Sequence, residues 1–504
     1  MKIVTMYLPQ FYETEENNRW WGKGFTEWRA VEGAKAFFEG HNQPRKPLND
    51  RYYNLLDKET MIWQSDLMKK YHIYGQCFYH YWFENGKQIL EKPAENLLKW
   101  SDIQMPFCFC WANESWVRSW SAIVDSNTWA LKFEPAKDST EDSGILLHQG
   151  YGTEYEWKQH FEYLLPFFKD KRYIKIHGKP MFIFYRPDNI QCLSEMTKCW
   201  NQWARENGLK GIYFIGGNTS NKRCLDATYL HATGSMFPTN YYKVKNSVKT
   251  ISYDAVWKYI ISQGIIAEKG MYIGGIIDFD TSPRKGKNGV VITECDSIKY
   301  EKYLKRLLKL NADLGNEITF INAWNEWGEG MYLEPDKKNS FAFLEATKRA
   351  LESYTNENID HDIENDKKIL LTFYKNKMEQ YKKNWLVLEQ WMQRKEHKEP
   401  LRKTLEKMKI TSVAIYGLGM FGTHLKAELE DSDIIIKYAI DIRKEGIVQE
   451  LPVLGLNDDF PEVDAIIVSV VNEFDIIAEQ LREKTNIPVI SLEKILFEQE
   501  CTEL

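Results

Sequence analysis

Short apolar runs and longer amphipathic stretches alternate eight times through the first 354 residues of this 504-residue chain. The apolar runs predict strands over residues 3–8, 73–82, 106–112, 181–186, 211–216, 227–232, 271–279 and 318–324. Helical periodicity between most of them predicts helices over residues 59–71, 154–168, 193–207, 253–269, 297–314 and 341–354. Alternating strands and helices form parallel βαβ units, and eight units suit a (β/α)8 TIM barrel with inserted loops. A doubly wound open sheet is the other possibility, but no glycine-rich phosphate turn follows the first predicted strand.

Residues 355–404 predict a helical linker after this barrel, which we assign to residues 1–354. Residues 355–366 are polar, and a helical pattern follows over residues 367–398. Its apolar residues recur at the a and d positions of a heptad repeat: Leu371, Tyr374, Met378, Tyr381, Trp385, Leu388 and Met392. One interpretation is a coiled coil that makes the chain a homodimer through residues 367–398. The other is a helix packed along the barrel or the next domain.

Residues 405–504 predict a small Rossmann-like α/β domain, with strands over residues 412–416, 434–440, 465–470 and 488–491. Gly417, Gly419 and Gly422 follow the first of these strands, and Asp441 closes the second. This spacing fits the nucleotide-binding fingerprint. A nucleotide or nucleotide-sugar ligand is one interpretation of this domain, and a structural or partner-docking module is the other.

Composition excludes several classes of protein. The eight cysteines have no regular spacing and no CxxC pair, which argues against a disulfide scaffold and a zinc ribbon. The net charge of −6 gives no basic footprint for nucleic acid or anionic lipid. The chain opens directly on a predicted strand and contains no apolar run of membrane-spanning length, so we expect a cytoplasmic protein with reduced thiols. Sixteen of the 18 Trp precede residue 355, which indicates that the two ends of the chain have different functions.

The strongest chemical signal is a pair of carboxylates, Glu326 and Glu329, directly after the eighth predicted strand. The carboxyl ends of barrel strands carry the active site. On a helical turn the two side chains would be neighbours at about 5–6 Å. Carboxyl pairs at this distance serve retaining glycosidases and wider pairs serve inverting ones, and the spacing alone does not choose between them. Trp324 and Trp327 flank the pair and would raise a carboxyl pKa towards general-acid function; solvated or salt-bridged glutamates are the alternative.

Aromatic and polar residues lie at or just after the ends of the second, third, fourth, seventh and eighth predicted strands. Aromatic faces can cover the C–H faces of sugars while polar groups bind the hydroxyls. We therefore predict substrate contacts from Tyr79, His80, Tyr81, Trp82, Trp111, Asn113, Glu114, Trp116, Arg118, Tyr185, Arg186, Asp278, Trp324, Asn325 and Trp327. For the intervening residues we expect core packing, as for Phe78, Phe109, Cys108 and Cys110.

The N-terminal loop carries three further tryptophans, at positions 20, 21 and 28. Such a loop is not an ordinary solvated connection, and we expect it to fold over the barrel mouth and to supply binding surface.

Several motifs together resemble the WbsX-like family, which is related to the endo-α-mannosidases of glycoside hydrolase family 99. They are Tyr7-Leu8-Pro9-Gln10-Phe11, Trp20-Trp21-Gly22-Lys23-Gly24-Phe25-Thr26-Glu27-Trp28, Tyr79-His80-Tyr81-Trp82, Cys110-Trp111-Ala112-Asn113-Glu114 and Asn322-Ala323-Trp324-Asn325-Glu326-Trp327. The resemblance implies a (β/α)8 barrel acting on glycans, often in bacterial O-antigen or capsule settings. Members are commonly labelled glycosyltransferases, although the fold is that of a hydrolase.

The resemblance also implies catalytic roles. Glu326 would be the base acting on the sugar 2-hydroxyl, and Glu329 the general acid/base at the leaving oxygen. The mannosidases are retaining enzymes thought to pass through a 1,2-anhydro sugar, and this chemistry requires no metal. This sequence has Gly328 where they place a His, which bears on the mannose preference.

Three functions remain open from the sequence. The first is a retaining glycoside hydrolase or transglycosylase that uses Glu326 and Glu329 on an oligo- or polysaccharide, with no cofactor at the barrel. The second is a glycosyltransferase that uses a sugar nucleotide, with the C-terminal domain helping to hold the donor. The third is a glycan-binding scaffold without catalytic activity. The barrel motifs contain no clear diphosphate site, which favours the first function.

Overall fold

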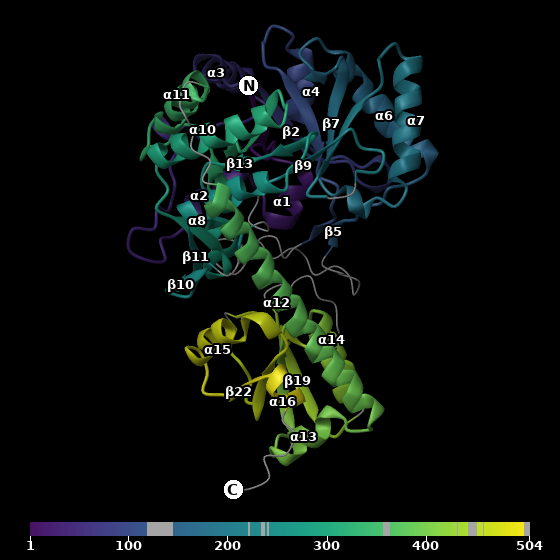
Figure 1. Cartoon of the computed structure of the whole chain (residues 1–504), viewed down its shortest axis with the longest axis vertical. Helices are drawn as coiled ribbons and strands as arrows, with labels where there is room; N and C mark the ends of the chain where they lie inside the picture. Colours follow the sequence, from purple (N-terminus) through teal and green to yellow (C-terminus); the bar gives the residue numbers. More distant parts are fainter. Residues whose placement is uncertain are drawn as a thin grey trace. The chain divides into compact units, whose positions relative to one another are not determined.

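The computed structural model describes residues 1–117, 145–219, 222–232, 237–238, 241–355, 363–430, 432–441, 451–456 and 458–497. These residues form two compact units (Figure 1). Nearly all described residues up to Leu370 belong to the first unit, and residues from Leu371 onwards belong to the second. The predicted Arg118 contact lies outside the described residues.

The first unit is a barrel of parallel strands. In chain order the strands are β1 (Lys2–Tyr7), β2 (Gly75–His80), β3 (Phe107–Trp111), β7 (Lys179–Phe184), β8 (Tyr213–Gly217), β9 (Ala227–Leu230), β12 (Met271–Ile273), β13 (Gly275–Ile276) and β15 (Ile318–Asn322). Consecutive strands from β1 to β9 in this list pair in parallel, and β1 also pairs with β15. The seventh strand is divided at Gly274: β12 pairs with β9, and β13 pairs with β15. The ring therefore closes, and the predicted (β/α)8 barrel is confirmed.

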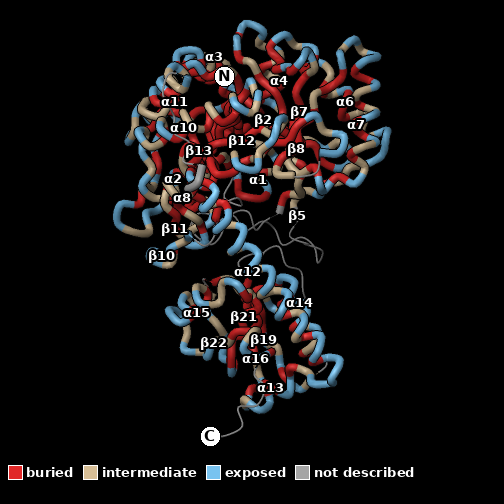
Figure 2. The backbone as a smooth tube through the Cα atoms, viewed as in Figure 1, coloured by how far each residue is buried: buried red, intermediate tan, exposed pale blue. Residues whose placement is uncertain are grey.

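Helices follow most of the strands and cover the outside of the barrel (Figure 1). They are α3 (Lys58–Lys70), α4 (Lys92–Lys99), α6 (Glu154–Lys169), α7 (Leu193–Glu206), α8 (Tyr253–Ser262), α10 (Ser297–Asp313) and α11 (Ala342–Ser353). Between β8 and β9 the described residues contain no helix, only turns. The barrel strands are almost entirely buried, because the helices cover one face and the interior side chains fill the other (Figure 2).

Shorter elements complete the carboxyl-terminal face of the barrel. In the N-terminal loop they are α1 (Glu15–Trp21) and α2 (Glu27–Gly33); after β13 they are α9 (Ser282–Lys285) and β14 (Val290–Thr293); after β15 they are β16 (Asn325–Glu326), a 3₁₀ turn (Trp327–Glu329) and β17 (Met331–Tyr332). Strands β4 (Trp116–Val117) and β5 (Ile145–Leu147) pair with each other, and β10 (Lys243–Lys245), β11 (Val248–Ser252) and β14 form a small separate sheet. At the amino-terminal end of β7, the short strand β6 (Lys175–Ile176) pairs with its first residues. The tryptophan-rich loop buries Trp20, Trp21 and Phe25 against Tyr81 and Trp116, which follow β2 and β3.

The second unit contains a five-stranded parallel sheet. Its strands are β18 (Ser412–Tyr416), β19 (Ile435–Ile440), β20 (Val453–Leu454), β21 (Ala465–Val468) and β22 (Val489–Ser491). Their order across the sheet is β20-β19-β18-β21-β22, so the first strand lies in the middle and the sheet extends outwards in both directions. With helices α13 (Leu401–Lys407), α14 (Met420–Glu430), α15 (Phe474–Arg482) and α16 (Leu492–Phe497), this order confirms the predicted Rossmann-like fold.

A single helix, α12 (Ile363–Glu396), replaces the predicted helix over residues 367–398. Near its C-terminal end Val387 and Trp391 pack into the core of the second unit. Most of the heptad residues do not pack there and are exposed. Among the described residues, no helix is both long and apolar enough to cross a membrane.

Candidate functional site

Backbone contacts fix the chain after β15 to the end of β1. Trp324 donates its backbone N–H to the carbonyl of Met6 at 2.8 Å. The amide of Asn325 forms two hydrogen bonds with the backbone of Leu8, accepting its N–H at 2.8 Å and donating to its carbonyl at 2.9 Å. These contacts, made by a fully buried side chain, place Glu326 at the mouth of the barrel. Asn325 therefore has a structural role in this fold.

One arginine binds both predicted catalytic glutamates. Arg284, on the short helix α9, donates from Nη2 to Glu326 Oε2 at 3.1 Å and from Nη1 to Glu329 Oε1 at 2.7 Å. Its Nε donates to Glu27 Oε1 at 2.7 Å. The side chains of Glu27, Glu326, Arg284 and Glu329 are 3%, 8%, 18% and 29% exposed, so this Arg284 cluster is largely shielded from solvent and opens at Glu329.

The shared guanidinium limits the separation of Glu326 and Glu329. Its two Nη atoms are bonded to the same carbon, Cζ, so the contacting carboxyl oxygens lie at most about 8 Å apart. This limit is compatible with both the short retaining and the wider inverting separation of carboxyl pairs.

The cluster perturbs the proton affinities of its members. Burial is the main cause that raises the pKa of Glu326 to about 8; Arg284 opposes this effect, whereas Glu329 and Glu27 add to it. Burial also disfavours the charged form of Arg284, but the three carboxylates outweigh it and hold the pKa of the guanidinium well above its ordinary value. Glu326 is therefore a proton-holding group near neutral pH, beside a permanently charged arginine.

Gly328 leaves the space that the Glu27–Arg284 ion pair occupies. A Cβ at this position would collide with Glu27 Oε1 and lie 2.9 Å from Arg284 Nε. Any side chain at residue 328 would therefore have to displace Glu27. The glycine that the sequence places between the two catalytic candidates is thus linked to the presence of Glu27 and Arg284.

A fourth carboxylate, Glu334, is hydrogen-bonded to the 3₁₀ turn through Trp327. It accepts hydrogen bonds from Trp327 Nε1 at 2.7 Å, from Tyr53 Oη at 2.8 Å and from Gln64 Nε2 at 2.8 Å. Burial raises the pKa of Glu334 to about 7, although these donors act in the opposite direction. Trp327 also stacks on Tyr332, with ring centroids 3.7 Å apart. Trp324 and Trp327 are both fully buried, so they shape the floor of the site.

Three tyrosines of the barrel strands lie near the glutamates. Burial, followed by the charge of Glu326, raises the pKa of Tyr79 and Tyr81. Burial also raises the pKa of Tyr185, which has Glu329 among its charged neighbours. The Tyr185 ring contacts the Tyr79 ring edge to face, with centroids 6.4 Å apart. The Tyr79 hydroxyl lies 3.3 Å from His231 Nε2, which in turn contacts Asn322 Oδ1 at 2.9 Å.

His80, Trp82 and Trp111 lie elsewhere, in the packing between the barrel and α6. His80 Nε2 contacts His160 Nε2 at 2.8 Å, and burial lowers the pKa of His80 to about 3. Trp82 stacks on the His160 ring at 4.4 Å, and Trp111 donates its indole N–H to the Trp82 carbonyl at 3.0 Å. These three residues are thus on the opposite strand face from Tyr79 and Tyr81, and their contacts are with the core.

The residues after β3 are joined to those after β7 by hydrogen bonds and an ion pair. The fully buried Asn113 accepts the backbone N–H of Arg186 at 2.8 Å and donates to its carbonyl at 2.8 Å. Arg186 forms an ion pair with Glu114 at 3.1 Å and lies over the Tyr185 ring. Trp116 belongs to the cluster under the N-terminal loop and contacts Tyr81. Glu114 and Arg186 are about one-third exposed and remain available at the barrel mouth.

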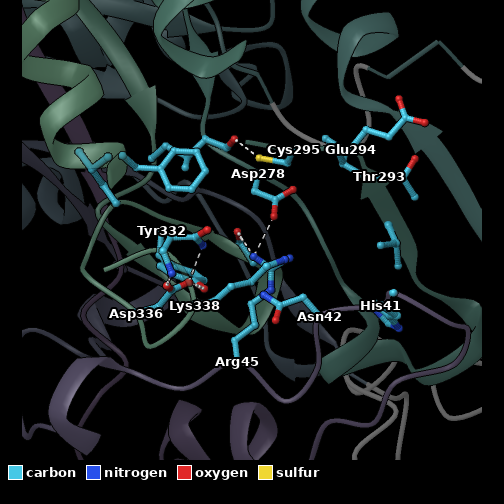
Figure 3. A pocket seen from close by; sticks show the side chains of 18 of the residues that line it. His41, Asn42, Arg45, Asp278, Thr293, Glu294, Cys295, Tyr332, Asp336 and Lys338 are labelled. Atoms are coloured by element: carbon cyan, nitrogen blue, oxygen red, sulfur yellow. Dashed lines mark hydrogen bonds and ion pairs between the residues drawn. The ribbon is translucent and has the colours of Figure 1, made fainter. Parts of the chain in front are cut away.

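Asp278 lines a separate cavity of about 250 Å³ (Figure 3). It forms an ion pair with Arg45 at 2.9 Å, and Arg45 also donates to the Gly330 carbonyl at 3.2 Å. The neighbouring Asp280 accepts hydrogen bonds from His41 at 2.8 Å and from Gln43 at 2.7 Å. The Asp280 backbone N–H donates to the Glu329 carbonyl, so this network joins the loops that carry Arg284 and Glu329.

The glycine-rich loop of the second unit fits only part of the nucleotide fingerprint. Gly417 has a φ of +85°, a Cβ on Gly422 would collide with the Gly417 carbonyl, and Gly419 has no heavy atom within 4 Å of its Cβ position. The loop could thus approach a phosphate closely. Asp441 is buried and accepts the Leu418 N–H at 2.7 Å, so part of its hydrogen-bonding capacity is used within the loop itself.

The described residues contain no cluster of three or more His, Cys, Asp or Glu side chains suited to a metal ion.

Sequence reasoning found the carboxylate pair but missed the arginine that binds it. Glu27 was present in the tryptophan-rich motif, yet its ion pair with Arg284 spans 257 residues. Arg284 lies a few residues after Asp278, at the end of the seventh predicted strand. This position was the only signal in the sequence that Arg284 could belong to the site.

Comparisons with known proteins agree with the motifs. The family model described as Glycosyltransferase WbsX matches residues 3–347. Two curated proteins named "Uncharacterized protein WxcX", from two strains of Xanthomonas campestris pv. campestris, are each 31% identical over 362 residues, which cover 69% of this chain and 49% of theirs. The chain thus spans about half the length of the curated relatives it matches.

Among solved structures, two of the glycoside hydrolase family 99 endo-alpha-mannosidase from Bacteroides thetaiotaomicron are 16% and 15% identical. They cover 70% of this chain and 97% of theirs, with TM-scores of 0.42 and 0.40. The family model covers well over half of the chain. The chain therefore belongs to the WbsX glycosyltransferase family, a family of carbohydrate-active enzymes.

Proposed function

We propose that the barrel cleaves or transfers glycosidic bonds with retention, in a bacterial polysaccharide of the O-antigen or capsule type. The observation that carries the catalytic pair is the Arg284 cluster, in which one guanidinium holds the contacting oxygens of Glu326 and Glu329 within about 8 Å of each other. Retention is the outcome that the resemblance to the family 99 mannosidases implies. The substrate is an oligo- or polysaccharide, the reaction needs no cofactor at the barrel, and the protein acts in the cytoplasm.

In this proposal Glu326 is the base. It takes the proton of the sugar 2-hydroxyl, whose oxygen then attacks the anomeric carbon as the bond to the leaving oxygen breaks. A buried carboxylate with a pKa of about 8 is a strong base once ionised, which suits this task. The product is a 1,2-anhydro sugar and a protonated Glu326.

Glu329 is the acid/base. It gives its proton to the leaving oxygen and later takes a proton from the water or sugar hydroxyl that opens the anhydro ring, while Glu326 returns its proton to the 2-oxygen. Glu329 Oε1 accepts a hydrogen bond from Arg284 Nη1, so Glu329 has to release Arg284 before this oxygen can carry a proton. Glu329 is the most exposed carboxylate of the cluster, as a group that moves should be. Arg284 is a positioning residue, held by Glu27.

Tyr79, Tyr81 and Tyr185 are the substrate contacts that we propose from the barrel strands, with Glu114 and Arg186 at the rim. The tyrosine rings can cover sugar C–H faces, and the rim charges can bind hydroxyls.

The runner-up function is a sugar-nucleotide-dependent glycosyltransferase. The family description and the glycine-rich loop of the second unit favour it. A nucleotide or nucleotide sugar at that loop accordingly stays a prediction. The arginines disfavour a diphosphate at the barrel, because those of the described mouth and its adjoining cavity are already paired with carboxylates. They are Arg45, Arg186 and Arg284.

The deciding experiment compares the full chain with Glu326→Gln and Glu329→Gln on a panel of bacterial polysaccharides, with release of oligosaccharide as the readout. We expect both variants to lose at least 100-fold in rate, the scale of general acid–base catalysis. Glu32→Gln, an exposed position on α2, is the matched control and should keep full activity. Unchanged turnover in both variants would overturn the carboxylate mechanism, and release that depends on an added sugar nucleotide would establish the transferase instead.

A further inference from the structure

Helix α12 carries an apolar stripe that the rest of the described chain does not cover. Its members are Leu371, Tyr374, Met378, Tyr381, Trp385 and Met392, which are between 43% and 72% exposed. Val387 and Trp391 pack into the core of the second unit, and Leu388, which belongs to the same heptad series as the stripe, is partly buried against that core. Figure 2 shows the part of α12 before this packed end as largely exposed.

The spacing of the stripe identifies what can cover it. Successive members are separated by alternating steps of three and four residues, with Leu388 completing the series. This is the a/d pattern of a coiled coil, whose partner is another helix with the same repeat. No other helix of the described chain lies against the stripe, so a second copy of α12 is the occupant that the pattern fits.

The area is sufficient for such a partner. The six exposed side chains present on the order of 700 Å² per copy, close to the ~800 Å² per partner of a standard stable interface. Monomeric proteins rarely leave an apolar patch of this size open without a function.

Charges beside the stripe decide the orientation of the two helices. In a parallel pair, Lys377 of each copy would face Lys382 of the other, which gives two repulsive contacts and no attractive one. In an antiparallel pair, Lys375 of each copy can face Glu389 of the other. That register leaves one unfavourable contact, between the two copies of Lys382 near the twofold axis.

The same antiparallel register pairs the stripe with itself. Tyr381 lies opposite Trp385 at the centre, Met378 opposite Leu388, and Tyr374 opposite Met392 at the ends. Aromatic pairs and methionine–aromatic contacts are favourable in such layers. We propose that the chain forms a homodimer through an antiparallel coiled coil of α12, centred on Tyr381 and Trp385.

The test measures the mass of the full chain by analytical ultracentrifugation at micromolar concentration. We expect a dimer, and a monomer for Met378→Glu/Trp385→Glu with an unchanged circular dichroism spectrum. Glu379→Lys/Gln393→Lys, which changes exposed positions beside the stripe, is the matched control and should stay dimeric. A monomeric parent chain, or a dimer that survives Met378→Glu/Trp385→Glu, would overturn the proposal.

Disulfide trapping tests the orientation. Tyr374→Cys/Met392→Cys should give covalent dimers on oxidation, since these positions face each other in the antiparallel register. Leu371→Cys should not, because the two copies of residue 371 would lie about 36 Å apart along the helix axis. The parent chain, with its own free cysteines, measures the background. Covalent dimers of Leu371→Cys alone would show a parallel pair and refute the register.

Discussion

Replacing Glu27 by Gln tests whether the Arg284 cluster sets the proton affinity of Glu326. Glu27 is almost fully buried and contacts Arg284 at 2.7 Å, so its charge acts on Glu326 through the protein interior and not through water. Burial is the main cause of the raised pKa of Glu326, about 8, and the negative charge of Glu27 contributes in the same direction. Removing that charge should therefore lower the pKa of Glu326.

The size of the change follows from the shared guanidinium. Glu27 and Glu326 contact Nε and Nη2 of Arg284, which places their oxygens at most about 8 Å apart. At this distance two unit charges interact by about 2 kcal/mol with an effective dielectric constant of about 20, which equals a change of about 1.5 in pKa. We expect Glu27→Gln to lower the pKa of Glu326 from about 8 by roughly this amount.

The measurement needs no substrate. Infrared spectra recorded over a pH titration follow the C=O stretch of the protonated Glu326 carboxyl, which is assigned by its absence in Glu326→Gln. Glu32→Gln on the same helix is the matched control and should leave the midpoint in place. A midpoint that stays near 8 or rises in Glu27→Gln, with the near-ultraviolet circular dichroism unchanged, would refute the reasoning.

Three further predictions concern stability, each measured by denaturant unfolding. Gly328→Ala should lower the free energy of unfolding by about 1–3 kcal/mol, because the added Cβ displaces Glu27 from Arg284. Gly419→Ala adds its Cβ to open space and should lower the free energy of unfolding far less. Equal losses in the two variants would contradict this account. Glu326 has a pKa of about 8 in the folded protein and 4.5 as its ordinary value, so its stabilising effect is complete below about pH 4.5 and is lost as the pH rises towards 8. The unfolding free energy of the parent chain should therefore fall by several kcal/mol more over this pH interval than that of Glu326→Gln. Curves of unfolding free energy against pH that run parallel for the two proteins would refute this prediction. Asn113→Ala should cost about 2–3 kcal/mol, because it leaves the Arg186 backbone groups without their buried partner; a loss below about 0.5 kcal/mol would show that water replaces the amide.

The barrel could be predicted strand by strand, because its signal is local. Every strand is a short apolar run that ends at a turn, and burial on both faces keeps such runs apolar throughout. The division of the seventh strand at Gly274 was not predictable, since it depends on Tyr229 and Leu230 of another strand, which leave no room for a side chain there. The helix expected over residues 253–269 is also shorter, because α8 gives way to a 3₁₀ turn after Ser262.

The site could be predicted only in part, because contacts between distant loops leave no pattern in the chain. The glutamate pair was visible as a local motif, whereas Arg284 and Glu27 meet only in three dimensions. Alternation along β2 indicates that Tyr79 and Tyr81 share one face and His80 and Trp82 the other. Both faces are aromatic, so alternation could not tell which one enters the barrel mouth. His160 on α6 decides it by packing against His80 and Trp82.

The charge of the Arg284 cluster bears on the chemical class of the substrate. Three carboxylates surround one guanidinium, so with Glu27 and Glu329 ionised the cluster carries a net charge of −2 when Glu326 is ionised and −1 when it is protonated. A diphosphate would meet repulsion in both states, at a site that is shielded from water and hence screens charge weakly. A sugar hydroxyl, in contrast, can donate to a carboxylate oxygen in either state and can take the place of Arg284 at Glu329. The electrostatics of the described cluster thus favour a neutral glycan over a sugar nucleotide at the barrel mouth.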